Sequence, residues 1–236
     1  MKKKIITIII CNYNNEKYIK NCLYSVINQK KNKIPYNVIF VDDNSKDNSL
    51  YIAKKILKKF RNSTIVKNNL NLGLTKSCNK AIKLCKTNYF IRVDSDDYIS
   101  NYFIHFFEKF AKNNKYELIT SNRIDFKKDK SIRKKILKKN FDIFKLVSCG
   151  VALKTNKVKK IGMYKNLLWE EYDLYVRYLN PEKRNIKIIE KNLYYYRRHQ
   201  KSMSYKKKWI KKAWHQIISK YGRKKLLRFG QIPIKL

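Results

Sequence analysis

Short apolar runs alternate with stretches of helical periodicity along the first hundred residues. Apolar positions recur every three or four residues from Tyr18 to Ile27 and from Leu50 to Phe60, the second stretch following a possible helix cap at Ser45 or Asp47. Between and around these stretches lie four continuous apolar runs typical of buried parallel strands: Ile5 to Cys11, Asn37 to Val41, Thr64 to Lys67 and Tyr89 to Val93. This order predicts a doubly wound α/β fold, in which ligands bind beyond the carboxyl ends of the strands.

The second half of the chain has a looser pattern. Glu117 to Ser121 and Val151 to Lys154 are predicted strands, and the very basic stretch between them, Lys127 to Lys139, is interpreted as a solvated loop or helix. A helix is predicted from Trp169 to Leu179, because apolar residues recur with helical spacing and Pro181 follows.

The last segment, 205–236, mixes Lys and Arg with Trp, Ile and Leu residues. We interpret 1–204 as one domain, with a nucleotide-binding half (1–98) and an acceptor-side half (99–204), followed by a basic, helical, amphipathic tail (205–236). Such a tail is typical of a segment that lies on an anionic membrane surface. The alternative is a basic helix that packs on the domain.

No run of about 18 apolar residues is present, so no transmembrane helix is expected. The apolar start of the chain is short, ends at Asn12 and has no small-residue cleavage site after it, which favours a buried strand over a signal peptide. The five cysteines form no CxxC pair and lie in or beside apolar runs, as is typical of reduced thiols. We therefore expect a cytoplasmic protein, bound peripherally to the cytoplasmic face of a membrane.

The charge balance is strongly basic. The chain has 57 Lys and Arg against 17 Asp and Glu, a formal net charge of +40. This predicts association with polyanions such as nucleic acid, anionic lipid or nucleotide diphosphates, without choosing among them. A codon bias towards Lys, Asn, Ile and Tyr explains many of the lysines equally well.

The few acidic residues are clustered. Nine of the 17 form three groups: Asp42, Asp43 and Asp47; Asp94, Asp96 and Asp97; Glu170, Glu171 and Asp173. The first two groups directly follow predicted strands, at the carboxyl edge of the sheet. Packed like charges destabilise a fold unless a cation offsets them, and Mg²⁺ or Mn²⁺ is the natural choice for carboxylate oxygens. The Asp-Ser-Asp at 94–96 is a DXD pattern of this kind, although acidic turns of the same composition are common.

Five segments, in order, resemble the family 2 glycosyltransferases of the GT-A fold, a Rossmann-like, mostly parallel sheet flanked by helices. The resemblance runs from about Ile6 to Ser204. The segments are Thr7 to Asn14 followed by Glu16, Cys22 to Gln29, Val41 to Asp47, Asn71 to Gly73 and Arg92 to Tyr98.

The resemblance implies roles for donor-side residues: Thr7 and Tyr13 line the nucleoside, Asp43 accepts from the base, Asp94 contacts the ribose, and Asp96 binds the metal at the diphosphate. Where the family often has an Arg that holds the base, this chain has Lys76, which keeps the charge but loses the planar fork. The identity of the nucleotide base therefore stays open, and UDP is the first expectation for the donor nucleotide. The competing interpretations are core packing for Tyr13 and a helix cap for Asp47.

The third acidic group is similar to the family's acidic motif at the start of an acceptor-side helix. An acceptor hydroxyl must lose its proton as it attacks, so a general base is needed there. The family's usual base aligns with Glu171, and Glu170 and Asp173 are the neighbouring candidates. Alternatively, these acids only complement the helix dipole.

Downstream, Tyr196 to His199 with Ser202 and Ser204 resembles the loop that closes over the diphosphate in many relatives. This implies a metal-ligand role for His199 and phosphate contacts for Arg197 and Arg198.

The resemblance as a whole implies an inverting, metal-dependent glycosyltransferase of the hexosyltransferase type. It would move a sugar from a nucleotide-diphosphate sugar to a hydroxyl of a glycan or lipid-linked acceptor, in cell-surface polysaccharide biosynthesis. One alternative is a sugar-phosphate nucleotidyltransferase, whose glycine-rich phosphate loop is missing from Cys11 to Asn15. Another is a nucleic-acid-binding protein, but acids at the central cleft would repel a phosphate backbone, so no nucleic acid partner is expected.

Overall fold

The computed structural model describes residues 3–127, 130–137, 142–183, 185–199 and 207–234. The strands are β1 (Ile6–Asn12), β2 (Asn37–Asp42), β3 (Ser63–Lys67), β4 (Tyr89–Arg92), β5 (Tyr98–Ile99), β6 (Leu118–Lys127), β7 (Lys130–Lys135), β8 (Ala152–Lys154) and β9 (Ile186–Arg197). The helices are α1 (Glu16–Ile27), α2 (Ser49–Leu57), α3 (Leu74–Leu84), α4 (Phe103–Ala111), α5 (Thr155–Lys160), α6 (Glu170–Tyr178), α7 (Lys207–Tyr221) and α8 (Arg223–Leu227), with a 3-10 turn, η1, at Ile143–Lys145.

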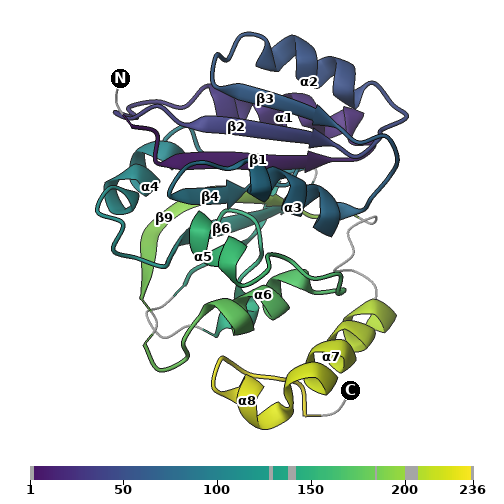
Figure 1. Cartoon of the computed structure of the whole chain (residues 1–236), viewed down its shortest axis with the longest axis vertical. Coiled ribbons are helices and arrows are strands. Elements are labelled where there is room, and N and C mark those ends of the chain that lie inside the picture. The colour runs from purple at the N-terminus through teal and green to yellow at the C-terminus, as the bar shows by residue number, and fades with distance from the viewer. Residues whose placement is uncertain (1–2, 128–129, 138–141, 184, 200–206, 235–236) are drawn as a thin grey trace.

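All described strands belong to one sheet, in the order β3-β2-β1-β4-β8-β6-β9-β5, with β7 paired to β6 (Figure 1). The first four are mutually parallel, as the sequence predicts, so their carboxyl ends lie at one edge. Beyond β4 the sheet is mixed, because β8 runs antiparallel to both β4 and β6 while β9 runs parallel to β6. The fold is a curled α/β sheet flanked by helices, and only its first half is parallel throughout.

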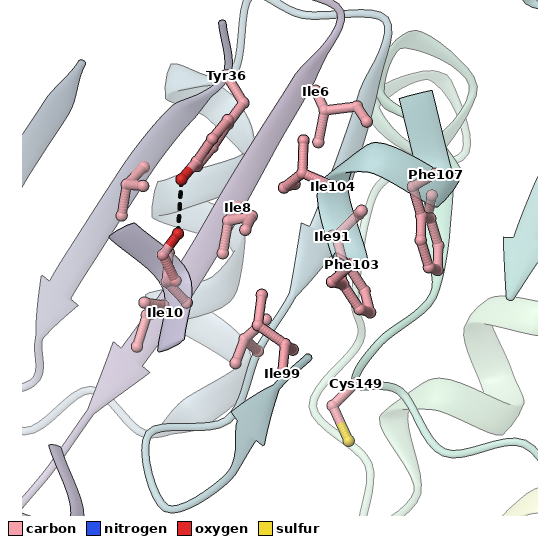
Figure 2. Close-up of a cluster of buried hydrophobic side chains, with 14 of the residues drawn as sticks. Ile6, Ile8, Ile10, Tyr36, Ile91, Ile99, Phe103, Ile104, Phe107 and Cys149 are labelled. Carbon is pink, nitrogen blue, oxygen red and sulfur yellow. Dashed lines mark hydrogen bonds between the residues drawn. The ribbon is translucent and has the colours of Figure 1, made fainter. Parts of the chain in front are cut away.

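Alternation along β1 divides the core between the two faces of the sheet. Ile6, Ile8 and Ile10 pack with α1, α2 and α4 on one face, where Figure 2 shows them beside Phe103 and Phe107. The intervening Ile9 packs with α3, α5 and α6 on the other face. Because successive side chains of a strand point to opposite faces, a continuous apolar run is needed to bury both.

The C-terminal helices pack on the second face, next to α6, and lie far from β3 (Figure 1). Ala213, Trp214 and Ile217 of α7 are buried, as is Leu226 of α8. The ring of Trp214 meets that of Trp169 at a centroid separation of 5.0 Å. The packed-helix interpretation therefore holds for these residues, which are unavailable for insertion into a bilayer. None of the described helices combines the length and apolar character that a bilayer crossing requires.

The interpretation of Lys127 to Lys139 as a loop or helix is wrong for its central part, which forms β7. This strand pairs antiparallel with β6, and its side chains are mostly exposed. Lysine-rich sequences are common on edge strands, because charge there prevents pairing with other chains. The sequence pattern also did not predict β9, whose apolar residues are interrupted by Lys and Glu.

Candidate active site

A cavity of about 1570 Å³ opens at the carboxyl edge of the parallel strands, and we call it the donor cavity. It is lined from four directions: the turn after β1, the ends of β2 and β4, the start of α6 and the end of β9. The predicted site residues in its lining are Tyr13, Asp43, Asp94, Asp96, Glu170, Glu171, Arg197, Arg198 and His199.

Asp43 holds the loop that leads into α3. Its carboxylate accepts hydrogen bonds from the side chain of Asn68 (2.8 Å) and from the backbone N–H groups of Leu72 (2.9 Å) and Gly73 (2.8 Å). Burial alone would raise the pKa of Asp43, but these hydrogen bonds outweigh it and lower the pKa. Asp43 is therefore a charged acceptor at the cavity wall.

Lys76 is exposed and lies outside the cavity lining, contrary to the expectation that it faces the base. On α3, Leu74 and Ser77 face the cavity, and Lys76 lies about 100° around the helix from Ser77. The lysine connected to Asp43 is Lys80, which donates to the Asn68 side-chain oxygen (2.7 Å).

Thr7 also lies away from the cavity. It is fully buried near the start of β1, and its hydroxyl shares a hydrogen bond with that of Thr87 (2.7 Å). A residue at this end of β1 cannot line a cavity at the carboxyl end. Tyr13, in the turn after β1, is 44% exposed and lines the cavity, so the core-packing interpretation of it is wrong.

Asp47 caps two helices at once. Its side chain accepts from the backbone N–H of Glu16, the first residue of α1 (2.9 Å), and from that of Ser49, the first residue of α2 (3.0 Å). The helix-cap interpretation of Asp47 is confirmed, and it has no part in the cavity lining.

The three acids of the DXD segment point to different partners. Asp94 accepts from Arg92 Nε (2.6 Å), Asp96 contacts His199 Nε2 (2.8 Å), and Asp97 accepts from the Tyr194 hydroxyl (2.7 Å). Burial raises the pKa of Asp96, Asp94 adds to the effect, and the hydrogen bond from His199 opposes it. Asp97 is buried and does not line the cavity.

The Asp96 and His199 pair is a donor set that divalent cations accept. Both side chains are about a quarter exposed at the cavity, and an oxygen and a nitrogen donor converge there. Among the described residues, Asp94, Asp97 and Cys149 also come together within 4.8 Å. That group fits Mg²⁺ or Mn²⁺ less well, because burial keeps the pKa of the Cys149 thiol high and thiols are soft ligands.

Glu170, Glu171 and Asp173 at the start of α6 have three different environments. Glu170 is buried and forms an ion pair with Arg92 (2.9 Å). Glu171 lines the cavity, where burial, with the charge of Glu170, raises its pKa to about 8. A carboxyl group with such a pKa can accept a proton near neutral pH.

Asp173 faces away from the cavity and is fully buried. It accepts from Arg177 (2.6 Å) on its own helix and from Lys220 (2.6 Å) and Tyr221 (2.6 Å) at the end of α7. Its placement among the catalytic candidates is not supported, because it fastens the C-terminal helix to α6.

The two arginines at the end of β9 line the cavity but are already engaged. The guanidinium of Arg197 lies between the rings of Tyr18 and Phe126, and its Nε donates to the Asp96 carbonyl (2.8 Å). Arg198 forms an ion pair with Asp125 (3.0 Å). Ser202 and Ser204, also considered from the sequence, lie outside the described residues.

The model of the family described as glycosyl transferase family 2 matches residues 7–178. The chain belongs to this family. A poly(ribitol-phosphate) beta-glucosyltransferase of Bacillus spizizenii is 39% identical over 114 residues, which is 48% of this chain and 18% of the relative. A poly(ribitol-phosphate) beta-N-acetylglucosaminyltransferase of Staphylococcus aureus, TarP, is 29% identical over 141 residues, 59% of this chain and 42% of the relative. The chain thus spans less than half the length of these relatives.

Solved structures share the fold of this family 2 chain. S. aureus TarS 1-349 in complex with UDP-GlcNAc has a TM-score of 0.72 at 21% identity, covering 92% of this chain and 67% of that one. The mannosyltransferase PcManGT of Pyrobaculum calidifontis, in complex with GDP-Man and Mn²⁺, has a TM-score of 0.66 at 12% identity, covering 99% of this chain and 67% of that one.

The sequence reasoning missed Arg92, which joins the two halves of this family 2 site. Arg92 is buried at the end of β4 and donates to both Asp94 and Glu170. It therefore connects the DXD segment to the start of α6. The available signal was a single cation at the end of an otherwise apolar strand, where burial requires an anionic partner.

Proposed function

We propose that this family 2 glycosyltransferase moves a sugar from a UDP-linked sugar to a hydroxyl of a glycan or lipid-linked acceptor, with inversion at the anomeric carbon. One observation carries the proposal: a single cavity brings the donor-side acids Asp43, Asp94 and Asp96 together with Glu171, whose pKa suits a general base. The similarity in fold to TarS, solved with UDP-GlcNAc, supports the donor class. The named relatives act on poly(ribitol-phosphate), which supports a role in cell-surface polysaccharide synthesis.

On the donor side, each of these cavity-lining groups has a chemical task. Tyr13 offers a ring face to the base, and the charged oxygens of Asp43 accept from its N–H. Asp94 accepts a hydrogen bond from a ribose hydroxyl, while Arg92 holds the Asp94 carboxylate in place. Arg197 and Arg198, which line the cavity, bring guanidinium charge to the phosphate oxygens.

Asp96 and His199 are the residues that would hold Mn²⁺ or Mg²⁺. Such an ion, when bound, stabilises the negative charge of the departing diphosphate. In the transfer itself, the acceptor oxygen bonds to the anomeric carbon as the bond from that carbon to the phosphate oxygen breaks. Glu171 takes the hydroxyl proton, and the nucleoside diphosphate leaves.

Donor screening tests this proposal. The full chain is heated with UDP, GDP, TDP and CMP sugars, with and without Mn²⁺, because a ligand that binds the folded state raises its melting temperature. We expect a shift with UDP sugars that needs Mn²⁺, and loss of the Mn²⁺-dependent part in Asp96→Ala. Asp47→Ala is not a suitable control because it removes two helix caps, so Glu190→Gln, exposed on β9, is used instead. No shift with any nucleotide sugar would refute the proposal.

We further propose a cytoplasmic location with peripheral attachment to an anionic membrane. The buried residues of α7 and α8 do not contribute to it. The support that remains is the net charge of +40, together with Trp209 (45% exposed) and Leu227 (60% exposed) among the basic residues of these helices.

A further inference from the structure

A second cavity, of about 700 Å³, adjoins the donor cavity, and Val147 and Cys149 line both. We call it the acceptor-side cavity. Arg123 of β6 and Lys135 of β7 lie on its basic wall, and Lys145 and Arg228 are further basic lining residues. Asp142 is the acid of the lining, and its carboxylate already accepts from the backbone N–H groups of Phe144 and Gln231. Leu137, Leu146 and Phe229 are among the apolar lining. This volume lies within the range of about 300–1,000 Å³ that is usual for small-molecule sites.

The basic wall contains an unbalanced group of charges. Asp125 is fully buried and forms ion pairs with Arg123 (2.9 Å), Arg133 (3.1 Å) and Arg198 (3.0 Å). Lys135 lies directly opposite Arg123 across the β6–β7 pair. Four cations thus surround one carboxylate.

Such an arrangement is costly without a further anion. Like charges directly opposite on paired strands destabilise a sheet. Burial, with the charges of Arg133 and Arg123, lowers the pKa of Lys135. Within the part of the chain that the structure describes, the Lys135 ammonium has no hydrogen-bond or salt-bridge partner. Among the same described residues, Arg123 hydrogen-bonds to Asp125 through its Nε, and its guanidinium lies over the Tyr196 ring, so its terminal N–H groups are left for a ligand.

We propose that the acceptor-side cavity binds a phosphate or phosphodiester group of the acceptor, between Arg123 and Lys135. Arginine offers paired donors that match two phosphate oxygens, and lysine adds a point charge. The apolar wall covers the carbon skeleton beside the phosphate. Because Val147 and Cys149 line both cavities, the proposal places the acceptor hydroxyl on the Glu171 side of these residues and the acceptor phosphate on the other side. This inference rests on the proposed function and names the acceptor's chemical class.

Lys135 is the residue to change, because its loss leaves no buried charge without a partner. Lys135→Gln removes the repulsion with Arg123, and Lys135→Glu replaces it with an attraction, so neither variant should lower the melting temperature. The matched control is Lys134→Gln. Lys134 is the preceding residue, carries the same charge, is exposed, and points to the other face of the strand.

Binding is measured by calorimetry on the full chain without donor, using a glycerol phosphate oligomer, the uncharged polyol glycerol and inorganic phosphate. We expect the oligomer to bind, glycerol not to bind, and inorganic phosphate to compete. Lys135→Gln should weaken oligomer binding about tenfold, as loss of a charged hydrogen bond typically does, and Lys135→Glu should weaken it further, while Lys134→Gln binds like wild type. Affinity for the nucleotide sugar should be the same in all forms.

Equal oligomer binding by Lys135→Glu and wild type would overturn the inference, as would an equal loss in Lys134→Gln. Binding of inorganic phosphate without binding of the oligomer would also overturn it. Phosphatidylglycerol vesicles are tested as a further probe. If binding to the vesicles depends on Lys135 and binding to the oligomer does not, the residue makes a membrane contact and the inference is overturned. The oligomer binding is measured without donor. It therefore shows whether the acceptor-side cavity binds a phosphodiester even if no nucleotide sugar binds and the proposed function fails.

Discussion

Glu171 is the residue on which the proposed chemistry depends. Its carboxyl group lies in the donor cavity with a pKa of about 8, raised by burial and then by Glu170. Arg92 opposes this increase and ties Glu170 to Asp94. The position of Arg92 makes the donor side and the base part of one charge network.

Replacing Glu171 with Gln should collapse turnover while the donor dissociation constant stays the same. The amide keeps the shape but cannot take up a proton, and general-base catalysis contributes about 10² to 10⁴-fold. Transfer kinetics and donor titration measure the two effects separately. Glu190→Gln is the exposed control and should retain full activity. If Glu171→Gln keeps most of its turnover, the base lies elsewhere.

The pH profile provides an independent check on Glu171. The base must be deprotonated, so below its pKa kcat/KM should fall about tenfold per pH unit, and above about pH 8 it should level off. The residual activity of Glu171→Gln should not show this fall of kcat/KM at low pH. A wild-type profile that is flat between pH 6 and 9 would contradict the assignment.

At the scale of elements, α6 serves the site on one side and the C-terminal helix on the other. Glu171 faces the cavity, while Asp173 binds Lys220 and Tyr221 of α7. Residues two positions apart on a helix point about 200° apart, so one acidic cluster can serve both sides. The sequence cluster alone could not separate these roles.

Asp173→Asn should destabilise the protein without changing the affinity for the donor. Removing one partner of a buried ion pair costs about 3–5 kcal/mol, because the other charge stays behind. The melting temperature should fall clearly, and proteolysis of α7 should accelerate. Acid should have a related effect on the wild type. The partners of Asp173 lower its pKa in the folded protein, although burial alone would raise it. The charged carboxylate therefore stabilises the fold fully at pH values above the pKa of Asp173 in the unfolded chain, and this stabilisation is lost as the pH falls through the lower pKa of the folded protein.

The control for Asp173→Asn is Glu182→Gln. Glu182 pairs with Arg228 at the surface, where an ion pair contributes only about 0–1 kcal/mol. Equal melting temperatures for Asp173→Asn and wild type would show that α7 is held by its apolar contacts alone.

At the scale of the whole molecule, the excess positive charge should bring the protein to anionic vesicles without insertion. Flotation should recover more protein with phosphatidylglycerol vesicles than with neutral ones, and the difference should vanish at high salt, because the attraction is electrostatic. Trp209→Ala, which changes an exposed ring, should weaken recovery only slightly. Equal recovery with neutral and anionic vesicles would contradict membrane attachment.

The sequence alone determined the parallel half of the fold and the edge where the site lies. Continuous apolar runs predicted β1 to β4, and acids directly after two of them marked the carboxyl ends. These features are local: burial on both faces requires apolar residues at successive positions, and a strand ends where charge begins. The positions of Asp43, Asp94 and Asp96 at the cavity followed from this pattern.

Only the tertiary structure decided which side chains meet. Arg92 pairs with Glu170 across 78 positions in the sequence, and Asp173 with Lys220 across 47. Lys76, Thr7 and Asp173 could not be excluded from the site before the direction of each side chain was known. A local sequence pattern indicates whether a position is buried. The partner of a buried charge, in contrast, depends on how elements that are distant in the sequence pack together.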